Sequence, residues 1–264
     1  MYCLNSVLIF LNSLLTIPLV GVNFNRLSYK DAIPWKKNHM PRKTLDQQLQ
    51  IIRDELLILS SMVETALIES VSALKDHDME RSQIVRDNDL KINRKRFDLE
   101  GRIIVAIAAE APVLHDLRFL ASAMNICTEL ERIGDYAKTI ARINLMSEGI
   151  SVPRFLGITY EMGIKASDML HRAMTAFIHT NSPSAVRIIS DDDIIDNMYN
   201  GLYAELMDFV VHGAHNMERA NYLLWVAHNL ERAGDRVTNI CERTIYVETG
   251  ELGDAAFVSP RLPK

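Results

Sequence analysis

The chain has 264 residues, of which 48% are hydrophobic and 24% charged, and this composition excludes a disordered tail or a collagen-like fibre. With 11 glycines, 8 prolines and 7% aromatic residues, it favours an all-α fold of long helices over many short strands. The net charge of −5 conceals an asymmetry, because residues 1–43 carry six basic residues and one acidic residue, which leaves −10 for residues 44–264. An acidic body of this kind argues against binding to a nucleic-acid backbone.

Residues 1–39 form an N-terminal extension that differs from the rest of the chain. Its first 24 residues are apolar but contain Pro18 and Gly21, and the basic residues follow this stretch instead of preceding it, as they do in a secretory signal peptide. We therefore expect either an over-predicted translation start, with Met40 as the real initiator, or a weak signal anchor. Both interpretations place the body of the protein in the cytoplasm.

The three cysteines are widely spaced and include no Cys-x-x-Cys pair, which is typical of a reducing compartment. Cys127 and Cys241 lie among apolar residues of segments with helical periodicity. We expect both to be small buried thiols, not metal ligands or nucleophiles.

Three apolar-periodic runs follow the extension. Thr44, with a glutamine three residues later, matches a capping box and predicts a helix start before a run over 49–74. A second run extends over 84–109 and is stopped by Pro112, because the residue before a proline resists helical geometry. A third run covers 117–145. The sequence therefore predicts three long antiparallel helices.

The next hundred residues repeat this plan. An ungapped alignment at an offset of 103 sets Asp89 against Asp192 and Asn93 against Asp196, and an L-E-R-x-G-D motif recurs at an offset of 100. Such internal self-similarity predicts two tandem three-helix bundles that lie side by side with pseudo-two-fold symmetry. The expected organisation is an extension over 1–39, a first bundle over 40–149, a second bundle over 150–250 and a flexible tail over 251–264.

The repeated motif places two carboxylates on an apolar row of its helix. Apolar residues in steps of three and four lead to Glu131 and Asp135 in the first copy, and to Glu231 and Asp235 in the second. Burying such a pair is costly unless a partner compensates. Neighbouring arginines are one source of compensation, and a divalent or trivalent cation held between facing helices is the other.

Duplication favours a selected constellation over a chance pair of acids. Each copy has an acidic or amide partner on the preceding helix, namely Asp89 and Asn93 in the first copy and Asp192 and Asp196 in the second. His228, three residues before the second motif, is a further candidate for a ligand or a hydrogen-bond partner.

The tandem organisation, the paired E-R-x-G-D segments and the stretch A-P-V-L-H-D-L-R-F-L at 111–120 together resemble the PhoU family of phosphate-transport accessory proteins. The resemblance covers residues 40–250. It implies two three-helix bundles whose E/D-x-x-x-D motifs line sites for iron, zinc, manganese or magnesium, with no organic cofactor and no catalysis. It also implies a cytoplasmic regulator, expected to be a homodimer, that acts between the phosphate ABC transporter and the phosphate-sensing histidine kinase and represses the phosphate-starvation response.

Carried over to this chain, the family motif implies a set of metal-ligand positions, to which the repeat alignment adds three acids of the preceding helices. The expected ligands are Glu131 and Asp135 in the first unit, Glu231 and Asp235 in the second, and Asp89, Asp192 and Asp196. Asn93 departs from the acidic pattern, so we expect the first site to be poorer in charge and weaker for metal.

Two other functions stay open at this point. A carboxylate-bridged metalloenzyme would need an open coordination position and a substrate. A metal-free structural bundle would pair its acids with arginines. The sequence contains no HExxH, Walker or nucleophile-elbow motif, which argues against the common hydrolase and nucleotide-binding classes.

Overall fold

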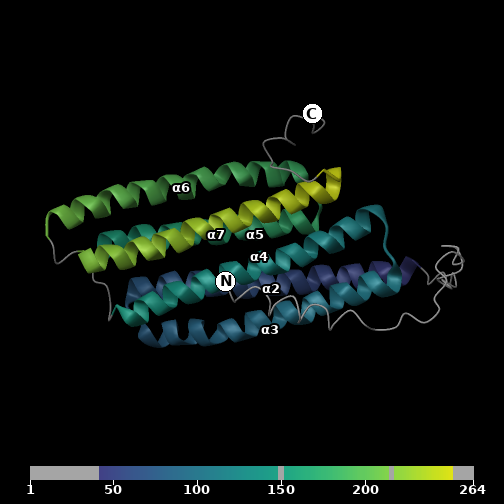
Figure 1. Cartoon of the computed structure of the whole chain (residues 1–264), viewed down its shortest axis with the longest axis horizontal. Coiled ribbons are helices and arrows are strands. Elements are labelled where there is room, and N and C mark those ends of the chain that lie inside the picture. The colour runs from purple at the N-terminus through teal and green to yellow at the C-terminus, as the bar shows by residue number, and fades with distance from the viewer. Residues whose placement is uncertain (1–41, 148–151, 214–216, 252–264) are drawn as a thin grey trace, which may run out of the picture. The chain divides into compact units, whose positions relative to one another are not determined.

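The computed structural model describes residues 42–147, 152–213 and 217–251, and all regular structure in these ranges is α-helical. The helices are α2 (Arg42–Asp76), α3 (Met79–Glu110), α4 (Leu114–Met146), α5 (Pro153–Ile178), α6 (Ser182–Val211) and α7 (Met217–Thr249), as Figure 1 shows. The predicted all-α class is confirmed. The predicted extension over 1–39 and all but the first residue of the predicted tail lie outside the described residues.

The helices form the two predicted three-helix bundles. In the first, α2, α3 and α4 pack on one another, and in the second, α5, α6 and α7 do the same. The bundles meet where α4 packs on α7 and α2 packs on α5, so α3 and α6 lie at opposite edges (Figure 1). Each outer helix therefore contacts chiefly the two inner helices of its own repeat.

Burial follows the repeat. Four apolar positions of α3 and the four residues 103 further on in α6 are all buried, and they are Val85, Ile92, Leu99 and Ile103, matched by Ile188, Ile195, Leu202 and Leu206. The same agreement holds between α4 and α7 at an offset of 100. The two offsets predicted from the sequence are thus the registers in which the side chains pack.

One hydrophobic core runs through both repeats. Phe119 of α4 stacks on Phe177 of α5 with ring centroids 5.0 Å apart. Gly163 of α5 lies against Val71 of α2, where an added Cβ would come within 2.7 Å of a valine methyl. These contacts join the two bundles through apolar packing at their shared face.

Helix starts follow equivalent capping residues in the two repeats. The side chain of Asp78 accepts a hydrogen bond of 2.9 Å from the Arg81 backbone N–H at the start of α3. The side chain of Asn181 accepts one of 3.0 Å from Ser184 N–H at the start of α6. Both satisfy a backbone donor that the first helical turn leaves unpaired.

The expected capping box at Thr44 is wrong, because α2 already begins at Arg42 and Thr44 lies inside the helix. The expected stop before Pro112 is confirmed. Ala111 adopts a left-handed conformation with φ 44° at the end of α3, so the chain leaves the helix one residue before the proline.

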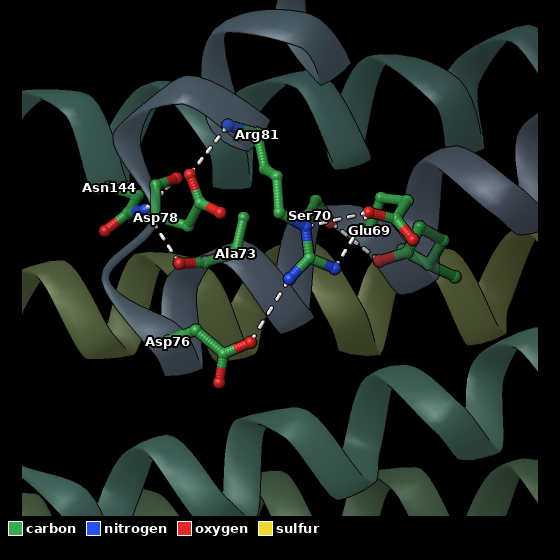
Figure 2. Close-up of polar contacts among 8 residues, drawn as sticks. Glu69, Ser70, Ala73, Asp76, Asp78, Arg81 and Asn144 are labelled. Carbon is green, nitrogen blue, oxygen red and sulfur yellow. Dashed lines mark hydrogen bonds and ion pairs between the residues drawn. The ribbon is translucent and has the colours of Figure 1, made fainter.

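The turn between α2 and α3 is tied to the rest of the first bundle (Figure 2). Asn144 of α4 donates from Nδ2 to the Ala73 carbonyl oxygen at 3.1 Å and to Ser82 Oγ at 2.8 Å. On the other side, the Arg81 guanidinium lies 2.9 Å from Glu69 Oε2 and 3.2 Å from Asp76 Oδ2 (Figure 2). These contacts hold α3 at a fixed position on α2 and α4.

A further expectation concerns the cysteines. Cys127 and Cys241 are buried free thiols, as predicted, and burial raises the pKa of each to about 12.

In the described part of the chain, the stretch Thr44–Asp76 is long and apolar enough to span a membrane by length and composition. Leu56 and Leu59 in this stretch are fully buried in the bundle core, which accounts for its hydrophobicity.

Candidate functional site

The two copies of the motif occupy the same place in the two repeats. Each lies on the last helix of its repeat, α4 or α7, and faces the middle helix, α3 or α6. Residues 130–140 and 230–240 have the same sequence of buried, half-buried and exposed positions. On α4 and α7 the two copies therefore differ in the identity of the side chains and not in burial, whereas on the facing helices Asp89 is buried and its equivalent Asp192 is half-buried.

In the first copy, a lysine joins the acids of α3 and α4. Asp89 of α3 is only 2% exposed, and Lys138 of α4 places its Nζ 2.6 Å from Asp89 Oδ2 and 3.6 Å from Asp135 Oδ1. Asn93 donates a further hydrogen bond of 3.0 Å to Asp89 Oδ2. The hydrogen bond to Asp89 raises the pKa of Lys138, so its ammonium stays charged at neutral pH.

Glu131 is the least compensated acid of the first copy. Burial, and then the charges of Asp135 and Asp89, raise its pKa, while Arg96 and Arg132 act in the opposite direction. Three cationic side chains, Arg96 from α3 and Arg132 and Lys138 from α4, therefore act on this group of acids. The first copy largely neutralises itself.

The second copy contains four carboxylates and lacks such a lysine. Asp192 and Asp196 of α6 face Glu231 and Asp235 of α7, and Thr238 stands at the position equivalent to the lysine of the first copy. Among the described residues, no lysine or arginine forms an ion pair within 4.0 Å of any of the four. Burial, and then the charges of the other three carboxylates, raise the pKa of Asp192 to about 7.

Two carboxylate oxygens of the second copy are buried without a hydrogen-bond partner, Asp192 Oδ1 and Glu231 Oε2. His228, an exposed residue, places its Nδ1 3.5 Å from Glu231 Oε2. Burial and the charge of Asp235 raise the pKa of Glu231. The charges of His228 and Arg232 lower the pKa of Glu231, but no ion pair of the described residues joins the carboxylates of α6 to those of α7. The second copy therefore offsets less of its negative charge than the first.

The glycines of the two motifs differ in what lies against them. A Cβ at Gly234 would collide with the carboxylate of Asp192, so the absence of a side chain lets this acid lie directly against α7. A Cβ at Gly134 would instead lie 3.4 Å from the methyl groups of Ile92, an ordinary contact. Gly234 is therefore needed to bring α6 and α7 acids together, whereas Gly134 has no such role.

The predicted metal ligands stay a prediction. In residues 42–147, 152–213 and 217–251, no three histidine, cysteine or acidic side chains are arranged to hold a metal ion. The chemistry of the donors nevertheless separates the two copies. An orphaned buried oxygen occurs in both copies, because Asp89 Oδ1 of the first also lacks a hydrogen-bond partner, so the number of acids and the lysine make the difference. Four carboxylates without a lysine between them fit a hard cation. In the first copy, the ammonium of Lys138 already lies between the acids, and the donors do not fit a second cation.

The neighbouring arginines that the sequence offered as partners form no ion pair with a motif carboxylate among the described residues, although Arg132 and Arg232 lower the pKa of Glu131 and Glu231. Arg132 and Arg236 pair with Glu129, at 3.8 Å and 3.4 Å, and not with a motif carboxylate. Lys138 and Arg96, which do act on the first copy, were not predicted. A position-by-position comparison of the two repeats beyond the motif would have found the lysine, because it is a threonine in the second repeat.

Comparisons with known proteins agree with the duplicated fold. The family model described as "PhoU domain" matches residues 56–143 and 159–244, once in each repeat. A Clostridium acetobutylicum protein named "Phosphate-specific transport system accessory protein PhoU homolog" is 30% identical over 216 residues, which cover 81% of this chain and 99% of the relative. The Escherichia coli "Phosphate-specific transport system accessory protein PhoU" is 29% identical over 204 residues, covering 77% and 85%.

Solved structures extend the likeness to three dimensions. The crystal structure of PhoU from Pseudomonas aeruginosa superposes with a TM-score of 0.74 at 28% identity, covering 78% of this chain and 99% of that one. The phosphate transport system regulatory protein PhoU from Streptococcus pneumoniae gives a TM-score of 0.73 at 29% identity, covering 80% and 99%. These relatives are named as accessory and regulatory proteins, not as enzymes.

Proposed function

Because this chain belongs to the PhoU family, we propose that it is a regulatory accessory protein of a phosphate-specific transport system. It acts in the cytoplasm between the phosphate ABC transporter and the phosphate-sensing histidine kinase, and it represses the starvation response when phosphate is plentiful. The observation that carries this proposal is the match of both three-helix repeats to the family, over nearly the full length of the relatives.

The proposed role is one of binding, without a reaction of its own. The inner helices α2, α4, α5 and α7 form a shared apolar core. This core fixes the positions of the outer helices α3 and α6, whose exposed faces are available to partners. An adaptor needs such a scaffold more than it needs a catalytic cleft. The carboxylate-bridged metalloenzyme is the rival function, and a search for turnover with the metal-loaded protein separates the two.

We further propose that a metal ion binds at the second acidic motif, with iron, zinc, manganese and magnesium as the candidates. The four carboxylates and the two orphaned oxygens of this motif support a hard cation. When bound, the cation supplies positive charge between α6 and α7. The residues of the motif then hold these two helices together, which fixes the surface of the second repeat.

A genetic test addresses the adaptor role. Deleting the gene should switch on a starvation-response reporter in phosphate-rich medium, and the wild-type chain should restore repression. The chain should also co-purify with the ATPase subunit of the transporter and with the histidine kinase. Continued repression in the deletion strain, or binding to neither partner, would refute the proposal.

A second arm tests the role of the acids. A variant with all four E-R-x-G-D carboxylates replaced by alanine should lose affinity for both partners. The matched control replaces four exposed acids outside the motifs, Asp46, Asp54, Asp98 and Glu161, and should bind normally. Normal affinity of the motif variant for both partners would show that the motif acids are not required for partner binding. Sedimentation of the same samples measures whether the chain is the expected homodimer.

A further inference from the structure

The most informative difference between the repeats lies three residues beyond the motif aspartate. Lys138 and Thr238 occupy equivalent half-buried positions on α4 and α7, with the same burial pattern on either side. The hydroxyl of Thr238 donates to the Asp235 backbone carbonyl at 2.7 Å, so it adds no charge between the helices. The lysine, in contrast, reaches across to the neighbouring helix.

The ammonium of Lys138 makes the contacts that a bound cation would make. It lies 2.6 Å from Asp89 on α3 and 3.6 Å from Asp135 on α4, and so joins carboxylates of two helices. Asp89 is 2% exposed, which means that water does little to solvate its charge. A buried carboxylate of this kind requires a nearby positive charge, and the chain itself supplies it.

A second substitution strengthens the contrast. Arg96 of α3 lowers the pKa of Glu131 and pairs with Glu100 at 3.3 Å. The equivalent residue of α6, at the offset of 103, is Tyr199, whose ring lies 6.3 Å from that of His228. Two positions that place a permanent positive charge near the first motif, 96 and 138, are thus uncharged near the second, whereas the arginine after the motif glutamate, Arg132 or Arg232, is present in both.

We propose that the two repeats have diverged into a self-neutralised motif and a cation-dependent motif, with Lys138 standing where the first motif would hold a metal. The proposal rests on the proposed function in one respect, since it assumes that the second motif binds a dissolved divalent cation. A divalent ion entering the first motif would meet the lysine ammonium and be repelled. The first motif therefore binds no divalent cation at any metal concentration, and its lysine holds α3 and α4 together. Only the packing of α6 on α7 is stabilised by added metal.

Reciprocal substitutions test this assignment on the full chain. Mn²⁺ is the probe, with binding measured from the EPR signal of the free ion and stability from the thermal midpoint with EDTA or with Mn²⁺. The wild type should bind one Mn²⁺ per chain with measurable affinity. Thr238→Lys should abolish this binding. Lys138→Thr should lower the midpoint in EDTA by about 5–10 °C, bind a second Mn²⁺, and recover the midpoint when Mn²⁺ is added.

Paired carboxylate variants locate the site even when Lys138→Thr fails to fold. Glu231→Gln with Asp235→Asn should remove Mn²⁺ binding, and Glu131→Gln with Asp135→Asn should leave it intact. Loss of binding in the first-motif pair would overturn the proposal. A folded Lys138→Thr protein that binds no additional Mn²⁺ would also overturn it.

The same measurements distinguish this inference from the metal part of the proposed function. A wild type that binds no Mn²⁺, together with a Lys138→Thr variant that does, would refute metal binding at the second motif and support the resident lysine. Normal Mn²⁺ binding in a chain that fails to engage the transporter or the kinase would refute the adaptor role and leave the divergence of the motifs standing.

Discussion

The two acidic motifs lie at equivalent places on α4 and α7, with the same burial pattern along these helices, and they differ in the charges around them. In the first, Lys138 pairs with Asp89 and lies near Asp135. In the second, Thr238 replaces the lysine, and an aspartate replaces Asn93. The comparison teaches that a duplicated motif does not ensure a duplicated site, because the residues outside the motif decide whether its acids are already neutralised.

The largest expected effect comes from removing the lysine. Lys138→Met leaves the buried Asp89 with the Asn93 hydrogen bond but no ion pair, and should lower the free energy of unfolding by about 3 kcal/mol in EDTA, since breaking a buried ion pair costs more than the pair contributes. The matched change Thr238→Met removes no charge and should cost less than about 1 kcal/mol. Urea denaturation checks both. Equal losses would show that the two positions are equivalent and would break the comparison.

The next effect is a pH dependence to which Asp192 of the second motif contributes most, because its pKa is raised further than that of Glu131 in the first motif. The native pKa of Asp192 is about 7, against an ordinary 3.8, so between these values the folded protein holds a proton that the unfolded chain releases. Stability should therefore fall as pH rises from about 4 to about 7, with a loss of about 2 kcal/mol for a half-buried group.

Thermal unfolding in EDTA at pH 5 and pH 8 measures this dependence. The midpoint should be higher at pH 5, and Asp192→Asn should reduce the difference. Asp46→Asn, which changes an exposed acid of α2, serves as the control and should keep the wild-type profile. A profile that Asp192→Asn leaves unchanged would show that the charge of this group is not the cause.

A smaller effect is expected from the motif glycines. Gly234→Ala forces the Asp192 carboxylate away from α7 and should destabilise the protein by about 1 kcal/mol while weakening Mn²⁺ binding. Gly134→Ala meets only the methyl groups of Ile92 at 3.4 Å, and the helix propensity of alanine should make it neutral or stabilising by up to about 1 kcal/mol. The reverse order of stabilities would contradict the role assigned to Gly234.

The fold could be predicted from the sequence because periodicity and duplication are strong local patterns. Apolar spacing over 84–109 and the stop at Pro112 correspond closely to α3. The alignment offsets coincide with the buried registers of both repeats. The start of α2 was predicted less well, since helix ends depend on a few residues and fray easily.

The partners of the acids could not be predicted in the same way. Arg132 follows Glu131 in the sequence, but adjacent residues of a helix point in different directions, and Arg132 is exposed. Lys138 reaches Asp89, which is 49 residues away in the sequence, only because α3 and α4 pack side by side. Such a contact depends on tertiary packing and on a long flexible side chain, neither of which a local motif describes.

The most direct test of the account is the Mn²⁺ stoichiometry of the double swap, Lys138→Thr with Thr238→Lys. If the charge at this position decides which motif takes a cation, the swapped chain should still bind one Mn²⁺, now at the first motif, and Glu131→Gln should weaken that binding while Glu231→Gln has no effect. A swapped chain that keeps its Mn²⁺ at the second motif would contradict the central claim.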